Sequence, residues 1–150
     1  MSEVSVRKMT VDDIKQVRIV EEACFATPWT EDIYQKELIQ NSYAHYYVIE
    51  KGKQIVGFCG IWIVVDEAQI TNIAILPTYR GCGYGSYLFQ YVINQAMLAG
   101  SVRLSLEVRV SNLVAQKLYR KFGLKPAGIR KNYYTDNNED AMVMWVNLNE

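Results

Sequence analysis

The stretch that most constrains the fold of this chain runs from residue 72 to residue 89. An apolar, strand-like segment ends at Pro77, because proline has no N–H group to donate to a neighbouring strand. Three alternating glycines follow at positions 81, 83 and 85, and an amphipathic helix begins after them. A helix N-terminus presents unpaired N–H groups and a positive dipole end, and glycine lets the backbone approach a phosphate closely. The stretch therefore predicts a strand, an anion-binding loop and a helix.

Two other kinds of phosphate-binding loop have to be weighed. A P-loop ends in Gly-Lys-Ser or Gly-Lys-Thr, and no lysine occurs between Gln54 and Lys117. A dinucleotide-binding fingerprint has the form G-x-G-x-x-G, and counting from Gly81 puts Ser86 in the place of its last glycine. Glu107 does lie roughly 20 residues further on, where an acidic ribose ligand is expected. Dinucleotide binding therefore stays open as a rival at this point, as does a tight turn that binds nothing.

The composition favours one domain over the whole chain, residues 1–150. The 16 basic and 16 acidic side chains cancel, which argues against nucleic-acid binding through bulk charge. The three cysteines, Cys24, Cys59 and Cys82, have no metal-ligand spacing, and no apolar run approaches the ~20 residues that span a membrane. We therefore expect a cytoplasmic monomer or weak dimer with reduced thiols, no metal, no direct nucleic-acid partner and no membrane contact.

Hydrophobic periodicity predicts the element order β-α-α-β-β-β-α-β-α-β-β. The expected helices cover residues 10–25, 30–41, 85–99 and 111–122, and the expected strands cover residues 5–9, 44–50, 55–65, 68–75, 101–110, 124–134 and 141–148. The helix at 85–99 connects the strands at 68–75 and 101–110, so these two strands should be parallel. The predicted fold class is therefore α/β with a mixed sheet, antiparallel at both ends and parallel only at its centre. This order disfavours the dinucleotide fold, in which strands and helices alternate from the outset.

The strand predicted at residues 101–110 has one apolar and one polar face, because leucine and valine alternate in it with polar residues. Glu107 is its one acidic residue and belongs to the polar face. It lies toward the end of the strand, where diverging parallel strands open a crevice in which ligands bind. A functional carboxylate would account for it, and so would a salt bridge to Arg103 or Arg109 on the same face.

Several motifs resemble those of the GCN5-related N-acetyltransferase (GNAT) family. Residues 80–85, Arg-Gly-Cys-Gly-Tyr-Gly, match its Q/R-x-x-G-x-G/A signature, and the predicted strand order matches its fold over almost the whole chain. The C-terminal half is similar to that of the bacterial ribosomal-protein-alanine N-acetyltransferases within the family. The motifs that carry this resemblance lie at residues 72–75, 106–112, 118–119, 122–124, 129–134 and 139–141.

The resemblance implies acetyl-CoA as the co-substrate. The cofactor-binding residues that it implies are Ile73, Ala74, Ile75, Arg80, Gly81, Cys82, Gly83, Tyr84, Gly85, Ser86 and Asn112. The strand residues among them would pair through their backbone with the pantetheine arm, as if it were an added strand. The glycine loop would hold the pyrophosphate, and Asn112 would contact the cofactor. The resemblance also implies Glu107 as the general base and Tyr119 as the general acid.

The chemistry of acetyl transfer is compatible with these roles. The acceptor must lose a proton, and an N-terminal α-amine has a pKa of about 7.7–8.0, so one nearby carboxylate suffices as the base. A phenol can protonate the departing thiolate, because the reaction forms that strong base only transiently. An N–H group on the unpaired strand edge at residues 73–75 would stabilise the carbonyl oxygen. For Tyr119 the structural alternative is a core position on the face of its helix.

Four aromatic residues are candidates for the acceptor groove, namely Phe25, Trp29, Tyr133 and Tyr134. The first two lie in a predicted loop between two helices, where packing alone would also account for them. With the resemblance, the four predict a groove for an extended peptide and acetylation of the N-terminal α-amine of a protein. The resemblance implies the N-terminal alanine of a small-subunit ribosomal protein as the acceptor. A small-molecule amine acetyltransferase of the same fold and a non-enzymatic acetyl-CoA-binding module are the alternatives.

Overall fold

The structure, a computed structural model, describes residues 3–148 and has the mixed α/β fold and the element order that the sequence predicts. The strands are β1 (Val4–Lys8), β2 (Ala44–Lys51), β3 (Gln54–Val64), β4 (Glu67–Ile75), β5 (Arg103–Arg109), β6 (Lys125–Tyr134) and β7 (Glu139–Asn147). The helices are α1 (Ile14–Cys24), α2 (Glu31–Gln40), α3 (Tyr84–Leu98) and α4 (Leu113–Lys121). Short 3₁₀ segments, Val11–Asp13 and Pro77–Tyr79, precede α1 and α3, so α1 begins later than expected. None of the helices described has the length and apolar character required to span a bilayer.

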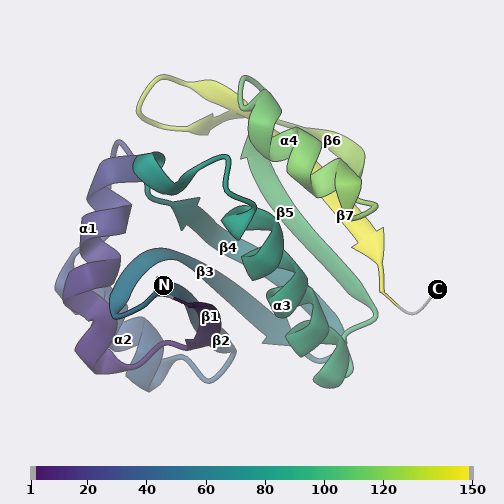
Figure 1. The fold of residues 1–150 in the computed structure, drawn as a ribbon. Helices are drawn as coiled ribbons and strands as arrows, with labels where there is room; N and C mark the ends of the chain where they lie inside the picture. Colours follow the sequence, from purple (N-terminus) through teal and green to yellow (C-terminus); the bar gives the residue numbers. More distant parts are fainter. Residues whose placement is uncertain (1–2, 149–150) are drawn as a thin grey trace.

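The described strands form one sheet in the order β1-β2-β3-β4-β5-β7-β6, and its parallel pair is β4 with β5. The ladder between these two strands joins only residues 67–69 to residues 103–105. Beyond it the strands diverge toward their C-terminal ends (Figure 1). β7 lies between β5 and β6, so the last hairpin folds back against β5. The sheet therefore opens at its centre, at the end of β4 that leads into the glycine loop.

Helices cover both faces of the sheet (Figure 1). Side chains alternate between the two faces of a strand, so neighbours in β2 belong to different hydrophobic clusters. Tyr47 and Ile49 pack in the cluster that contains α3, whereas Tyr46 and Val48 pack in the cluster that contains α1 and α2. The Sγ atom of Cys24, at the end of α1, donates to the carbonyl oxygen of Ile75, at the end of β4 (3.4 Å). This contact holds the connection between α1 and α2 beside the central opening.

Candidate active site

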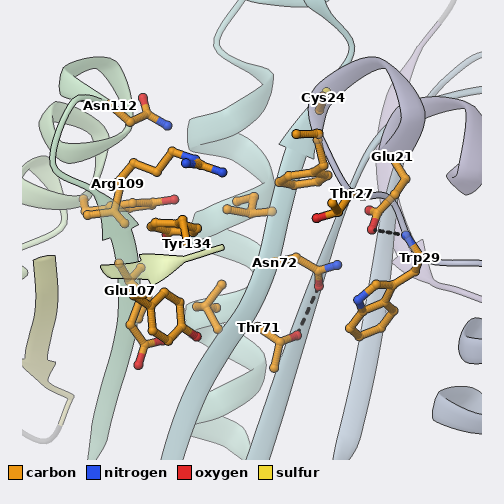
Figure 2. Close-up of a pocket in the computed structure, with 18 residues that line it drawn as sticks. Glu21, Cys24, Thr27, Trp29, Thr71, Asn72, Glu107, Arg109, Asn112 and Tyr134 are labelled. Carbon is orange, nitrogen blue, oxygen red and sulfur yellow. Dashed lines mark hydrogen bonds between the residues drawn. The ribbon is translucent and has the colours of Figure 1, made fainter. Parts of the chain in front are cut away.

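A cavity of about 420 Å³ lies where β4 and β5 diverge. Its lining comes from the end of α1 and the α1–α2 loop, from β4, β5 and α4, and from the end of β6. Figure 2 shows side chains of the α1–α2 loop on one side of β4 and those of β5 and β6 on the other. Small-molecule sites have volumes of about 300–1,000 Å³. The predicted site residues that line this cavity are Phe25, Trp29, Ile73, Glu107, Asn112, Tyr119, Tyr133 and Tyr134.

Glu107 lies on the wall of the cavity with 12% of its side chain exposed. Its carboxylate accepts from Gln69 Nε2 (3.2 and 3.4 Å) and lies 3.4 Å from Arg130 Nη1. The salt bridge of Glu107 is therefore with Arg130, and not with Arg103 or Arg109, the partners that the sequence suggested. Nη1 of Arg103 lies 3.8 Å from Oε1 of Glu67, and Arg109 binds acids of the β6–β7 hairpin. Both guanidinium groups therefore pair with carboxylates other than that of Glu107.

Tyr119 is 5% exposed and combines the two positions that the sequence leaves open. Its ring packs in the core, with its centroid 5.3 Å from that of Phe89. The same side chain lines the cavity. Burial raises the pKa of the phenol above its ordinary value, so the hydroxyl group keeps its proton at neutral pH. The neutral phenol of Tyr119 therefore has a proton that it can donate to a group in the cavity.

The glycine loop has the backbone geometry that the sequence predicts. Gly81 and Gly83 have φ values of +79° and +83°, in the left-handed region that favours glycine. Apart from the glycine and its two chain neighbours, no described heavy atom lies within 4 Å of the place where a Cβ atom would be at either position. Gly83 is the N-cap of α3, so the free N–H groups of that helix open directly onto the loop. The Nε atom of Arg80 donates to the carbonyl oxygen of Ile75 (3.1 Å), which ties the loop to the end of β4.

The edge of β4 that faces β5 has open N–H groups, although the carbonyl oxygen of Ile75 accepts from Cys24 and Arg80. The N–H group of Leu76 donates to Val56 on β3 (2.8 Å), and the direction of backbone groups alternates along a strand. Ile73 and Ile75 therefore point their N–H groups toward the diverging side, beyond the last β5 pair at Gln69. This edge leads from the cavity to the glycine loop.

Asn112 has a structural role beside its position on the cavity wall. Its Oδ1 atom accepts from the backbone N–H of Ala115 (3.1 Å) and caps α4. The two hydrogens of its amide nitrogen are not needed for this cap, and Figure 2 shows the nitrogen turned toward the cavity. The cap therefore fixes the direction in which Asn112 can donate.

Residues 14–124 of the chain match the acetyltransferase (GNAT) family. The chain belongs to this family. A Bacillus subtilis protein with the provisional name ribosomal protein bS18-alanine N-acetyltransferase is 56% identical over 146 residues, with 97% of each chain covered. The ribosomal protein bS18-alanine N-acetyltransferase of Escherichia coli (strain K12) is 33% identical over 142 residues, which are 93% of this chain and 95% of that protein. The crystal structure of the E. coli ribosomal-protein-S18-alanine N-acetyltransferase matches with a TM-score of 0.90 and 30% identity, covering 99% of this chain and 96% of that one.

Three predictions from the sequence are confirmed by these findings: the GNAT family, the mixed-sheet fold and an acetyltransferase as the class of enzyme. The dinucleotide-binding rival is wrong. Antiparallel strands flank the parallel pair on both sides, whereas a dinucleotide-binding sheet is mostly parallel. The glycine loop of this GNAT protein follows an antiparallel meander instead.

The polar residues of the GNAT cavity that were not predicted as site residues include Glu21, Asn72 and Arg109. The one sequence signal for Glu21 is its place on the apolar face of α1, four residues after Val17. Asn72 and Arg109 belong to motifs of the family resemblance, but a local pattern does not reveal that both face the cavity. Asn72 accepts from Thr71 Oγ1 (3.1 Å) at the centre of β4 (Figure 2).

Glu21 is a buried carboxylate beneath the α1–α2 loop, with 3% exposure. It accepts from the hydroxyl group of Tyr34 (2.8 Å) and from the backbone N–H of Trp29 (3.2 Å). Burial raises the pKa of Glu21, and the two hydrogen bonds oppose that shift only in part. Because Trp29 lies in the wall of the cavity, Glu21 fixes that wall to α1 and α2.

Proposed function

We propose that this protein transfers the acetyl group of acetyl-CoA to the N-terminal α-amine of a protein, with the N-terminal alanine of ribosomal protein bS18 as the leading acceptor. The observation that carries the proposal is one cavity in which a carboxylate and a tyrosine meet an open strand edge beside four aromatic rings. The acceptor is taken from relatives that are named for it, at 56% and 33% identity. Ribosomal proteins are made in the cytoplasm, where we expect the chain to act as a single domain, residues 1–150.

Acetyl-CoA, which supplies an acetyl group activated as a thioester, fits two parts of the structure. Residues 73–75 offer backbone groups with which the pantetheine amides would pair as in an added strand. Gly81 and Gly83 leave open space at the N-terminus of α3, where free N–H groups and the helix dipole favour a pyrophosphate. The remaining loop residues and Asn112 complete the proposed cofactor site.

Glu107 is the proposed general base. A carboxylate has about four acceptor positions. Gln69 and Arg130 do not occupy all of them in Glu107, so an amine or a water molecule can still donate to it. Its position at the wall of the cavity supports this role, because a base must lie within hydrogen-bond reach of the proton that it removes. The amine then has a free lone pair with which to attack the carbonyl carbon.

Tyr119 is the proposed general acid. Its phenol carries a proton at neutral pH, as a phenol with the ordinary pKa of about 10 does, and burial raises that pKa further. That proton would pass to the sulfur atom of the leaving thiolate. The N–H group of Ile73 or Ile75 on the open edge of β4 would donate to the carbonyl oxygen as it gains negative charge. One strand edge would thus both bind the pantetheine arm and stabilise the transition state.

The acceptor groove that we propose has two walls of aromatic side chains. Phe25 and Trp29 belong to the α1–α2 loop, and Tyr133 and Tyr134 end β6 on the other side of the cavity. An extended peptide N-terminus between these walls would present its amine to Glu107. Rigid aromatic rings suit such a groove, because they supply contact area at a low cost in conformational entropy.

The test is mass spectrometry of a peptide that begins with alanine, incubated with the protein and acetyl-CoA. We expect one added acetyl group at the α-amine and release of one free CoA per peptide. The same peptide with a formylated N-terminus is the control, because it lacks the reactive amine but keeps every side chain. Transfer to a polyamine and not to the peptide would support the small-molecule alternative. Binding of acetyl-CoA without transfer to any acceptor would support the non-enzymatic module.

A further inference from the structure

Arg109, the last residue of β5, binds the loop between β6 and β7 through both ends of its guanidinium group. Nη2 donates to both carboxylate oxygens of Asp136, each at 3.0 Å. Nη1 donates to Glu139 Oε1 and to Asn137 Oδ1, both at 3.2 Å. The two acids are only 25% and 15% exposed, so this network is better shielded than an ordinary surface ion pair.

The same guanidinium group also packs on an aromatic residue of the predicted acceptor groove. Its Cζ atom lies 4.0 Å from the centroid of the Tyr134 ring, within the distance of about 6 Å at which cation–π attraction acts. Tyr134 therefore lies against Arg109 in the wall of the cavity (Figure 2). We refer to Arg109, Tyr134, Asp136 and Glu139 as the Arg109 cluster.

The β-sheet ladder by itself does not hold Tyr134 firmly. The pairing of β6 with β7 shifts register between Arg130 and Tyr134, and Asn132 within that segment has a φ of +54°. Tyr134 follows this irregular segment and pairs only with Glu139. The position of its ring is therefore set to a large extent by its side-chain partners, which are Arg109 and the ring of Tyr133 (centroids 5.1 Å apart).

Arg109 itself is fixed from the opposite side. The side chain of Gln116, 3% exposed, donates to the backbone oxygens of Arg109 (3.1 Å) and Val110 (3.0 Å). Glu139 completes the link, because its Oε2 atom accepts from the backbone N–H of Ser111 (2.9 Å). The end of β5, the start of α4 and the β6–β7 loop are thus joined around one guanidinium group.

We propose that Arg109 is a positioning residue for the acceptor. It anchors the loop at residues 135–138 and holds Tyr134, part of one wall of the acceptor groove, at a fixed position relative to Glu107. Glu107 lies two residues before Arg109 on the same face of β5, so the base and this positioning residue are about 6–7 Å apart along one strand. This inference rests on the proposed function, and it adds the element that sets the position of the peptide.

The test compares Arg109→Lys with Arg103→Lys in steady-state assays with the alanine peptide. Lysine keeps the positive charge. It cannot form the paired hydrogen bonds to Asp136, and it lacks the planar guanidinium group that stacks on a ring. Arg103 is a matched control, because it lies on the same strand, pairs with an acid (Glu67, 3.8 Å) and packs on a ring (Trp145, 4.8 Å), but does not line the cavity. For Arg109→Lys we expect KM for the peptide to rise about tenfold, the factor that corresponds to ~1.4 kcal/mol, with little change in kcat. For Arg103→Lys we expect no change in either constant.

Two further measurements separate positioning from a general loss of stability. Calorimetry should give the same affinity for acetyl-CoA in both variants, and amide exchange at residues 135–138 should become faster only in Arg109→Lys. Asp136→Asn, which leaves Arg109 in place, should raise KM in the same direction. An unchanged KM in Arg109→Lys, or an equal rise in Arg103→Lys, would overturn the inference. A wild-type protein that does not acetylate the peptide would instead contradict the proposed function.

Discussion

The carboxylate of Glu107 is held by donors from two other strands. Gln69 is on β4, at the last position where β4 pairs with β5, and Arg130 is on β6. Arg130 reaches Glu107 across β7, which lies between β5 and β6. The carboxylate therefore has a defined position before any substrate arrives, which reduces the cost of orienting it for proton transfer.

Replacing this carboxylate by its amide tests the proposed base. Glu107→Gln keeps the size of the side chain but cannot accept a proton, so we expect kcat to fall at least ~10²-fold, the lower end for general-base catalysis. Acetyl-CoA affinity, measured by calorimetry, should not change. Glu67→Gln is the control, because that side chain is 63% exposed at the far end of the β4–β5 ladder. A rate near that of the wild type at every pH would mean that another group removes the proton.

At the scale of elements, the connection from β4 to α3 carries the proposed pyrophosphate site. Its conformation depends on two glycines with positive φ rather than on side-chain contacts, because nothing surrounds the place of a Cβ atom at Gly81 or Gly83. A substitution there changes backbone preference and little else. The site can therefore be tested by substitutions that alter only the backbone preference at these glycines.

Gly83→Ala should weaken acetyl-CoA binding by about tenfold, the factor for ~1.4 kcal/mol. Alanine disfavours a φ of +83° by roughly 1–2 kcal/mol, and relaxation of the loop would move the N–H groups at the start of α3. Gly100→Ala is the control, because Gly100 has a φ of +89°, equally free space and a position after the other end of α3. Both variants should lose similar free energy of unfolding in urea, and only Gly83→Ala should lose affinity in calorimetry. Equal affinities in the two variants would remove the loop from the cofactor site.

The helices and the glycine loop were predictable because their signals are local. Leu88, Val92 and Ala96 recur at helical spacing in α3 and are all buried, and alternation along β5 correctly separates its two faces. The ion pair between Glu107 and Arg130 was not predictable from such local signals. It depends on β7 lying between β5 and β6, which only the assembled sheet determines.

The same reasoning explains which parts of the candidate site the sequence missed. Arg109 lies on the polar face of β5, as the alternation along this strand predicts. Its hydrogen-bond partners, however, lie 27, 28 and 30 residues later in the chain. Glu21 receives its donors from Tyr34 and the backbone of Trp29, beyond the end of its own helix. Long-range polar networks of this kind have no periodic signature, whereas Tyr133 and Tyr134 belong to a motif of the family resemblance.

At the scale of the whole molecule, one sheet connects two hydrophobic clusters. β2 and β3 contribute side chains to both clusters, so disruption of one face removes support from the other. This arrangement favours a single cooperative unfolding transition, as expected for one domain of this size. Unfolding free energies measured in urea can then be compared between variants and between pH values.

Glu21 should make that free energy decrease as the pH rises. Burial raises its pKa in the folded state above the unfolded value, so the native protein holds the proton over a pH range in which the unfolded chain has lost it. The contribution is fully present below the unfolded pKa of about 4.3 and is lost as the pH rises through the folded value. Glu21→Gln does not titrate, so its stability relative to the wild type should improve as the pH rises above about 4.3 and should level off once the pH exceeds the folded pKa.

The measurement is urea unfolding of both proteins across that range, followed as the difference between their free energies. The other carboxylates titrate in both proteins and cancel in the difference, and any hydrogen bond from Tyr34 or Trp29 that glutamine loses adds an offset that is the same at every pH. Glu22→Gln is the neighbouring control, because that side chain is 57% exposed and pairs with Arg18 at the surface (3.1 Å). A difference that stays constant with pH, or that shifts in favour of the wild type as the pH rises, would mean that the folded protein does not destabilise the charged form of Glu21. In that case the two hydrogen bonds, and not burial, would dominate the electrostatics beneath the α1–α2 loop.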